Sequence, residues 1–294
     1  MTASGSSAPV QPGRSTPAAG RFALGDPARW PLVMGVINVT PDSFSDGGLH
    51  FDTDRAVEAA LAMHAAGAAI VDVGGESTRP GADPVPLEEE LRRVVPVVRG
   101  IRSASPVPVS VDTRNAAVAR AALEAGADVV NDVSALRHDP DMARVVREAG
   151  VPVVLMHMRG EPKTMQEGIR FDELIGEIRE DLTRWRDLAI ERGIEPSRIM
   201  VDPGLGFGKT FEHNVEILAR VGELRELGPV VIGASRKGFI GRLTGREGGR
   251  ARMAGSLAAV AAAALGGAAL VRVHDVAETV DFLEVLRPIM GASR

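Results

Sequence analysis

A unit in which a helix leads directly into a strand recurs along the chain and limits the folds that the chain can adopt. At four places an amphipathic stretch ends in Ala and Gly, and a short run of β-branched residues follows it. These runs begin at Ala69, Val129, Val153 and Leu270. Glycine readily takes the left-handed conformation that ends a helix, so each junction marks the point where a helix stops and a strand begins. The chain is therefore expected to alternate helices and strands.

Further apolar runs bring the number of strand candidates to eight. They lie at residues 32–39, 69–73, 107–112, 129–132, 153–157, 198–202, 230–234 and 270–274. Because helices separate consecutive strands, the strands must pair in parallel, and eight parallel strands can close without an edge. The sequence thus predicts an α/β protein built as a (β/α)8 barrel. The alternative, a doubly wound open sheet, usually has a glycine-rich turn after its first strand, where this chain has Asn-Val-Thr-Pro-Asp at 38–42.

The barrel is expected to form a single domain at residues 21–294. Residues 1–20 are rich in Ser, Pro, Ala and Gly and show almost no hydrophobic periodicity. Segments of this composition cannot bury enough apolar surface to fold, so we expect a disordered tail there.

Composition excludes several classes of function. The chain has no cysteine, which rules out disulfides, thiolate metal sites and a cysteine nucleophile. Its net charge of −5 and the lack of a basic stripe argue against a nucleic-acid surface. No apolar run free of charge is long enough to span a bilayer. We expect a soluble, cytoplasmic protein with neither a membrane nor a nucleic acid as its partner.

Lysine is scarce in this chain. Only Lys163, Lys209 and Lys237 occur among its 34 lysine and arginine residues. A lysine in such an arginine-rich chain is expected where a compact ammonium is needed and a planar guanidinium would not fit. The alternative explanation is neutral drift.

The predicted strands end in polar residues. These are Asn38, Asp72, Asp112, Asn131, Asp132, His157, Asp202, Ser235, Lys237, Arg272 and His274. In a (β/α)8 barrel the carboxyl ends of the strands and the loops after them build the active site. One polar residue at a strand end has an ordinary structural explanation, but the set indicates a binding site.

Asp112, Asn131 and Asp202 are suited to a planar heterocycle with a guanidine-like edge. A carboxylate accepts two parallel N–H bonds from such an edge, and an amide pairs with a donor and an acceptor on one ring. This is the chemistry of a pterin. Asp72 and Asp132 are expected instead to brace neighbouring loops.

Arg272 and His274 are separated by one residue, so both should point to the same side of the last strand. With Asn38 on the first strand, which adjoins the last in a closed barrel, they make a candidate pocket for a diphosphate and its divalent cation. The alternative is an Arg272 that faces the core and pairs with Asp275.

Two other features invite functional interpretations. The segment 204–210, Gly-Leu-Gly-Phe-Gly-Lys-Thr, ends like a phosphate-binding Walker loop, but Pro203 stands where that loop requires glycine. We interpret the segment as a flexible loop whose Phe207 packs near the ring. Lys237 lies in a polar loop, which favours hydrogen bonding to a carbonyl or carboxylate over Schiff-base chemistry.

The segments 34–48 and 72–81 resemble the two signatures of the dihydropteroate synthase family. The resemblance continues at Asp112-Thr113 and at residues 131–134, 156–160, 202–204, 235–237 and 272–276. It covers the whole chain after the tail. It implies condensation of 6-hydroxymethyl-7,8-dihydropterin pyrophosphate with 4-aminobenzoate in folate synthesis, with Mg²⁺ as the cofactor. It also implies that the protein is a homodimer and a target of sulfonamides.

The resemblance also implies roles for individual residues. It places the pterin at Asp112, Asn131, Met156, Asp202, Phe207 and Lys237. It places pyrophosphate at Asn38, Arg272 and His274, with Asn38 as the metal ligand. It frames aminobenzoate by Phe44, Thr78, Pro80, Ser235 and Arg236. Asp46 and Arg79 would organise the leaving group and join Asp112, Asp202 and Lys237 as catalytic residues.

The expected mechanism is dissociative, because cleavage of the C–O bond to pyrophosphate would leave a cation that the pterin ring stabilises. Two other functions compete with this interpretation. A pterin-binding methyltransferase would share the ring-binding residues but would not need Arg272 and His274. A non-catalytic paralogue would bind pterin or a partner protein without turnover.

Overall fold

The computed structural model describes residues 31–39, 49–77, 81–161 and 163–291. Its strands are β1 (Leu32–Asn38), β2 (Ile70–Gly74), β3 (Val109–Asp112), β4 (Val129–Asp132), β5 (Val153–Met156), β6 (Ile199–Asp202), β7 (Val231–Ile232) and β8 (Leu270–Val273). All eight predicted strands are confirmed. The tail expected at residues 1–20 lies outside the described residues.

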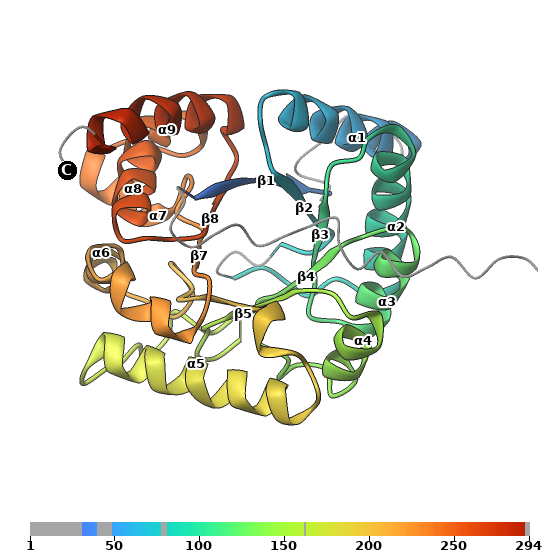
Figure 1. Ribbon diagram of the computed structural model, residues 1–294, viewed down its shortest axis with the longest axis horizontal. Coiled ribbons are helices and arrows are strands. Elements are labelled where there is room, and N and C mark those ends of the chain that lie inside the picture. The colour runs from blue at the N-terminus through green and yellow to red at the C-terminus, as the bar shows by residue number, and fades with distance from the viewer. Residues whose placement is uncertain (1–30, 40–48, 78–80, 162, 292–294) are drawn as a thin grey trace, which may run out of the picture.

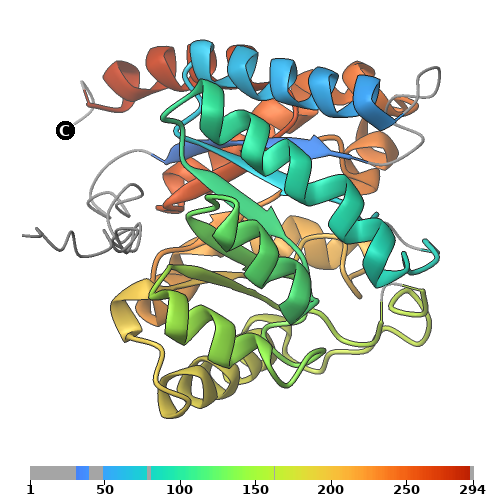
Figure 2. The ribbon, with the colours of Figure 1, turned by 90° about the vertical axis from the view of Figure 1, so that its right-hand side faces the viewer.

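Helices follow the strands in turn. The α-helices are α1 (Leu49–Ala65), α2 (Leu87–Ala104), α3 (Ala116–Glu124), α4 (Met142–Ala149), α5 (Leu174–Glu191), α6 (Phe211–Ala219), α7 (Gly238–Thr244), α8 (Met253–Leu265) and α9 (Val276–Gly291). Short 3-10 helices are η2 (Pro196–Arg198), η3 (Val221–Leu227) and η4 (Gly249–Arg252). Figure 1 shows the α-helices as a ring around the strands, and Figure 2 shows α1 to α4 along the outside of that layer.

The strands form one parallel sheet in the order β6-β5-β4-β3-β2-β1-β8-β7. Its two edge strands meet through a bridge between Val201 and Val230, which brings the sheet round into a barrel. The predicted (β/α)8 barrel is therefore confirmed. Strand β7 is shorter than the predicted run 230–234, because only Val231 and Ile232 pair with β8.

Side chains of alternate strand residues point to opposite faces, so the barrel has two hydrophobic regions. Outward residues such as Val71 and Val73 pack with helix residues such as Val94 and Val98 in the layer between strands and helices. The inner face carries a separate cluster of Met34, Ile70, Val129, Val154, Met200, Val231 and Leu270. This inner cluster forms an apolar floor, and the polar residues lie beyond it.

No helix in the described part of the chain combines the length and the apolar character needed to cross a membrane.

Candidate active site

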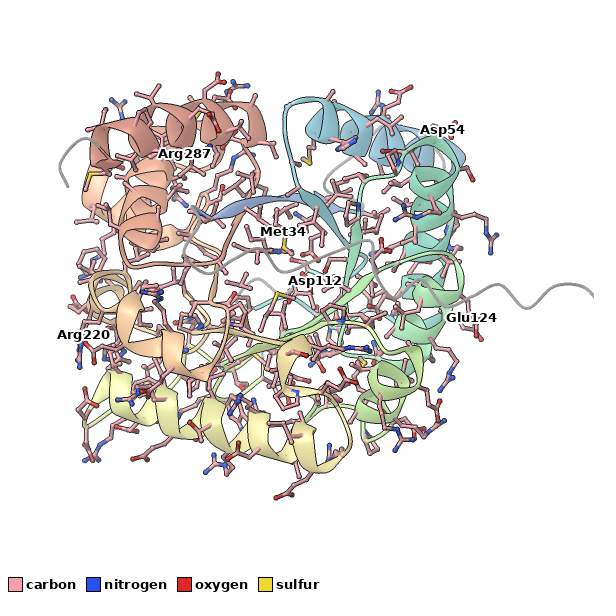
Figure 3. The ribbon with its side chains drawn as sticks, viewed as in Figure 1. Met34, Asp54, Asp112, Glu124, Arg220 and Arg287 are labelled. Atoms are coloured by element: carbon pink, nitrogen blue, oxygen red, sulfur yellow. The ribbon has the colours of Figure 1, made fainter. Side chains whose placement is uncertain are left out.

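The candidate site lies next to the apolar floor, at the next inward-facing positions along the strands. Two residues after Ile70, Val129, Val154, Met200 and Leu270, the inward positions are occupied by Asp72, Asn131, Met156, Asp202 and Arg272. Asp112 ends β3 and is paired in register with Asn131. Figure 3 shows Asp112 near the centre of the ring of helices, whereas Asp54, Glu124, Arg220 and Arg287 lie on its outside. The period-two pattern of the strands thus gathers polar side chains at one end of the barrel.

Arg272 connects two carboxylates inside the barrel. Its Nε donates to Asp72 Oδ2 at 2.6 Å, and its Nη2 donates to Asp112 Oδ2 at 2.7 Å. Asn131 Nδ2 donates to the same Asp72 oxygen at 3.1 Å. About a fifth of the Arg272 side chain, 22%, stays exposed.

These contacts correct two expectations. Asp72 does not brace a loop: it joins Arg272 to Asn131 within the site, because its position on β2 faces inward. The alternative pairing of Arg272 with Asp275 is wrong, because the carboxylate of Asp275 accepts from Arg236 instead, with Nε to Oδ2 at 3.1 Å.

Asp132 behaves as expected. Its carboxylate accepts hydrogen bonds from the backbone N–H of Ser134 at 2.7 Å, from Ser134 Oγ at 2.6 Å and from the backbone N–H of Leu136 at 2.9 Å. It points outward on β4 and braces the loop after that strand, which confirms its predicted structural role.

Burial changes the acidity of the inward carboxylates. Removal from water raises the pKa of Asp112 to about 7, with the positive charge of Arg272 acting against the rise and the carboxylate of Asp72 adding to it. Burial also raises the pKa of Asp202. Burial alone would lower the pKa of Arg272, but the charges of Asp72 and Asp112 outweigh it and raise that pKa. Arg272 therefore lies close to two carboxylates, Asp112 and Asp202, that take up protons more easily than usual.

An apolar wall stands beside these carboxylates. Val133, Met156, Met158, Met165 and Phe207 form a small buried cluster of their own. Lys237 Nζ lies 4.4 Å from the centroid of the Phe207 ring, within reach of a cation–π contact. On the carboxylate side, Asp202 Oδ1 accepts from the N–H of Gly204 at 2.7 Å. An apolar cluster next to oxygen acceptors suits a heteroaromatic ring with N–H groups along one edge.

The ends of β7 and β8 bring Ser235 and His274 together. Ser235 Oγ accepts from the backbone N–H of His274 at 3.2 Å and also lies 3.2 Å from its Nδ1. Arg236, which has a positive φ of 59°, points to the loop after β8 and pairs with Asp275, with Nη2 to Oδ1 at 2.5 Å. Arg236, which was expected near aminobenzoate, is thus paired with the loop after β8.

The remaining predicted site residues lie elsewhere or outside the described chain. Asn38 ends β1, where it pairs in register with Gly74. Phe44, Asp46, Thr78, Arg79 and Pro80 fall outside the described residues. The residues that the structure describes include no cluster of three or more His, Cys, Asp or Glu side chains able to hold a metal.

The sequence interpretation missed a buried polar pair, His157 and Lys209. The segment 204–210, expected to be a flexible loop, is closely packed: Lys209 is only 3% exposed, and its Nζ lies 2.8 Å from Nδ1 of the fully buried His157. Gly204, with φ of 70°, allows this packing, because a Cβ there would lie 1.9 Å from the carbonyl oxygen of His157. The scarcity of lysine was a sequence signal that could have pointed to a special role for Lys209.

Comparison with known proteins gives consistent results. Residues 34–274 match the family model described as pterin binding enzyme. A dihydropteroate synthase of Synechocystis sp. is 46% identical, over 83% of this chain and 85% of its own length. The structure of Xanthomonas albilineans dihydropteroate synthase with 4-aminobenzoic acid superposes with a TM-score of 0.86 at 47% identity, over 94% of this chain and 99% of that one. A second structure from that organism, in complex with 7,8-dihydropteroate, gives a TM-score of 0.83 at 46% identity, over 92% and 97% of the two chains.

Proposed function

The chain belongs to the pterin-binding enzymes, and within them to the dihydropteroate synthases, and from this premise we propose how its residues divide the work of the reaction. The reaction condenses 6-hydroxymethyl-7,8-dihydropterin pyrophosphate with 4-aminobenzoate to give 7,8-dihydropteroate and pyrophosphate. The chain is thus a transferase of folate synthesis that forms a C–N bond.

The pterin ring is proposed to lie between the inward carboxylates and the apolar wall. Asp112, Asn131 and Asp202 would bind the polar edge of the ring, while Met156 and Phe207 pack against its face and Lys237 donates to its carbonyl oxygen. The observation that carries this placement is the convergence of these six side chains from β3, β4, β5, β6 and the loops after β6 and β7. A carboxylate that accepts paired N–H donors is a strong and directional contact.

The pyrophosphate is proposed to lie near Arg272 and His274, toward the end of β1. Mg²⁺ prefers oxygen ligands and in phosphate sites takes only one or two from the protein, the rest coming from phosphate and water. The side-chain oxygen of Asn38 fits that pattern. The bound cation would neutralise charge on the departing pyrophosphate.

For aminobenzoate, we retain Phe44, Thr78, Pro80, Ser235 and Arg236 as a proposal, with Asp46 and Arg79 near the leaving group. Ser235 has support from its place between the ends of β7 and β8 beside His274. The support for Arg236 is smaller, because its guanidinium already pairs with Asp275. A sulfonamide that imitates aminobenzoate should compete for the same place.

The chemical step is proposed to be dissociative. The C–O bond between the pterin methylene and pyrophosphate breaks, and its electron pair leaves with pyrophosphate. Asp112 and Asp202 favour the positive charge that develops on the ring, while Arg272 and His274 favour the negative charge that departs. The neutral amine of aminobenzoate then attacks the methylene carbon, forms the C–N bond and loses one proton.

We also propose that the protein acts as a cytoplasmic homodimer. Support for a dimer comes from large apolar side chains exposed on neighbouring helices: Leu265 on α8 is 57% exposed, and Val285 and Ile289 on α9 are 63% and 57% exposed. Exposed apolar surface of this kind is typical of a face that another chain covers.

A turnover assay with both substrates and Mg²⁺ tests the assignment of the site. Wild-type protein should form dihydropteroate, and Lys237→Ala and Asp202→Asn should each reduce kcat/KM by about a hundredfold or more, as expected from loss of charged contacts in a buried site. Lys163→Ala is the matched control, because Lys163 lies on the surface and pairs with Asp83. Wild-type protein that folds and binds pterin but makes no product would point to the non-catalytic paralogue.

A further inference from the structure

We propose that Lys209 is a positioning residue for the pterin site: its buried ammonium, held against His157, fixes the loop that carries Phe207 beside Lys237. Lys209 and His157 do not themselves contact the substrate. The inference rests on the proposed placement of the ring against Phe207 and Lys237.

The ammonium of Lys209 ties two parts of the barrel mouth together. Its Nζ donates to Phe207 O at 2.9 Å and to His157 O at 3.3 Å, and lies 2.8 Å from His157 Nδ1. An ammonium has three N–H donors, so these three contacts use all of them. One side chain thus joins the end of β5 to the loop after β6.

The imidazole of His157 connects Lys209 to a carboxylate on α5. Burial and, after it, the nearby charge of Lys209 lower the pKa of His157 to about 3, so the ring is neutral. Nδ1 then accepts from Lys209, and Nε2–H donates to Asp181 Oδ2 at 3.2 Å. Arg159 Nη2 donates to the same carboxylate oxygen at 3.0 Å. Burial lowers the pKa of Lys209 to about 7, and the carboxylate of Asp181, 24 residues beyond His157, acts against that fall and favours the ammonium form.

The chain around Lys209 is closely packed, which favours a compact ammonium over a larger guanidinium. The loop backbone lies directly against the chain after β5: a Cβ at Gly204 would lie 1.9 Å from His157 O, and a Cβ at Gly208 would lie 2.9 Å from Arg159 O. Arginine is the usual cation of this sequence, yet lysine stands at this position. The ammonium group, whose three N–H bonds point in different directions, meets three acceptors here. The planar guanidinium group of an arginine could not reach all three.

Lys209 affects the pterin site through the position of Phe207. Lys209 holds the carbonyl of Phe207, and the Phe207 ring packs with Met156 and lies 4.4 Å from Lys237 Nζ. Other bonds anchor the rest of the loop, since Gly206 O accepts from Gln166 Nε2 at 2.7 Å and the N–H of Gly206 donates to Asn214 Oδ1 at 2.6 Å. Loss of Lys209 should therefore displace Phe207 without unfolding the barrel.

The first test is Lys209→Met, which keeps the length of the side chain and removes its three donors. KM for dihydropterin pyrophosphate should rise about tenfold or more, while KM for aminobenzoate changes less than about twofold. Lys209→Arg should be impaired as well, because charge alone does not restore the geometry. Lys163→Met makes the same exchange at an exposed lysine and should leave both constants unchanged.

A double-mutant cycle separates positioning from general damage. If Lys209 acts through Phe207, then Lys209→Met should change the pterin KM by less than about twofold in a Phe207→Leu background. Effects that multiply would overturn the inference, as would a folded Lys209→Met with an unchanged pterin KM. If Lys209→Met does not fold, His157→Phe is the substitute test and should raise the pterin KM by a smaller factor. An unchanged pterin KM in His157→Phe would also overturn the inference.

The same experiments distinguish failure of the inference from failure of the proposed site. If Phe207→Leu and Lys237→Ala both leave the pterin KM unaltered, then the ring does not lie where we propose. If they raise it and Lys209→Met does not, then only the role of Lys209 is wrong.

Discussion

At the scale of single residues, Arg272 sets the charge balance at the mouth of the barrel. Its guanidinium pairs with Asp72 and Asp112, while Asp202 lies nearby as a third buried carboxylate. Arg272 thus lies among three carboxylates, and the charge of Lys237 also acts on Asp202. Such a site favours a ring that offers N–H donors and gains positive charge as it reacts.

Asp112 should make binding of the pterin substrate depend on pH. Because burial raises its pKa to about 7, Asp112 carries a proton below that pH and loses part of its capacity to accept hydrogen bonds. We expect kcat/KM for dihydropterin pyrophosphate to fall as the pH drops below about 7, approaching tenfold per pH unit. Asp112→Asn should lower activity and abolish this limb of the profile. A limb that persists unchanged in Asp112→Asn would assign the titration to another group.

His157 should make the fold sensitive to acid. Its pKa drops from 6.5 to about 3 on folding, so between these values the unfolded chain binds a proton that the folded chain does not. Stability from this residue is complete above pH 6.5 and is lost as the pH falls toward 3, by about 1.4 kcal/mol per pH unit. Asp181, whose pKa is lowered first by its bond to His157, acts in the same direction.

Urea unfolding between pH 4 and pH 7 measures this effect. The free energy of unfolding of His157→Phe should depend less steeply on pH than that of the wild-type protein. Equal slopes for the two proteins would show that His157 takes up its proton in the folded state.

At the scale of elements, the loop at 204–210 combines backbone strain with close packing. Gly204→Ala should be strongly destabilising, because the residue has a positive φ of 70° and its Cβ would collide with His157 O. Gly168→Ala is the matched control: its φ is 61°, but nothing lies within 4 Å of the added Cβ. The control should cost about 1 kcal/mol from strain alone and Gly204→Ala at least about 2 kcal/mol more, as measured by urea unfolding. Equal costs would mean that the loop moves away freely.

The same loop shows where prediction from sequence succeeds and where it fails. Strands 129–132 and 153–156 could be placed because apolar runs and glycine-ended helices are local patterns, and alternation then puts Asn131 and Met156 on the inner face. Lys209 and His157 could not be paired, because they are 52 residues apart and meet only when β5 and β6 lie side by side. Asp72 was misassigned for a similar reason: its partner Arg272 is 200 residues away.

At the scale of the whole molecule, closure of the barrel brings the last strand next to the first. Strand β8 pairs with β1, so Arg272 lies beside Met34 in register and the polar ends of β1, β2, β3 and β8 face one space. An open sheet could not bring Arg272 to Asp72 and Asp112 in this way. Asp72 from the second signature and Arg272 from the segment 272–276 therefore meet in a single site.

The exposed apolar side chains on α8 and α9 give a prediction for assembly. Val285→Glu should shift the protein from dimer to monomer in size-exclusion chromatography with light scattering, because it places a charge on a face that we expect a second copy to cover. Leu188→Glu, on α5, provides the control, since Leu188 is an exposed apolar residue on a different helix. A wild-type protein that is monomeric at every concentration tested would contradict the proposed dimer.

The most direct test of the central claim is a crystal structure of this protein with dihydropteroate bound. We predict that the polar edge of the pterin ring lies within hydrogen-bonding distance of Asp112, Asn131 and Asp202, with its face against Met156 and Phe207 and its carbonyl near Lys237. A ring bound away from the inner face of the barrel, with these carboxylates still paired only to Arg272 and Gly204, would contradict the account.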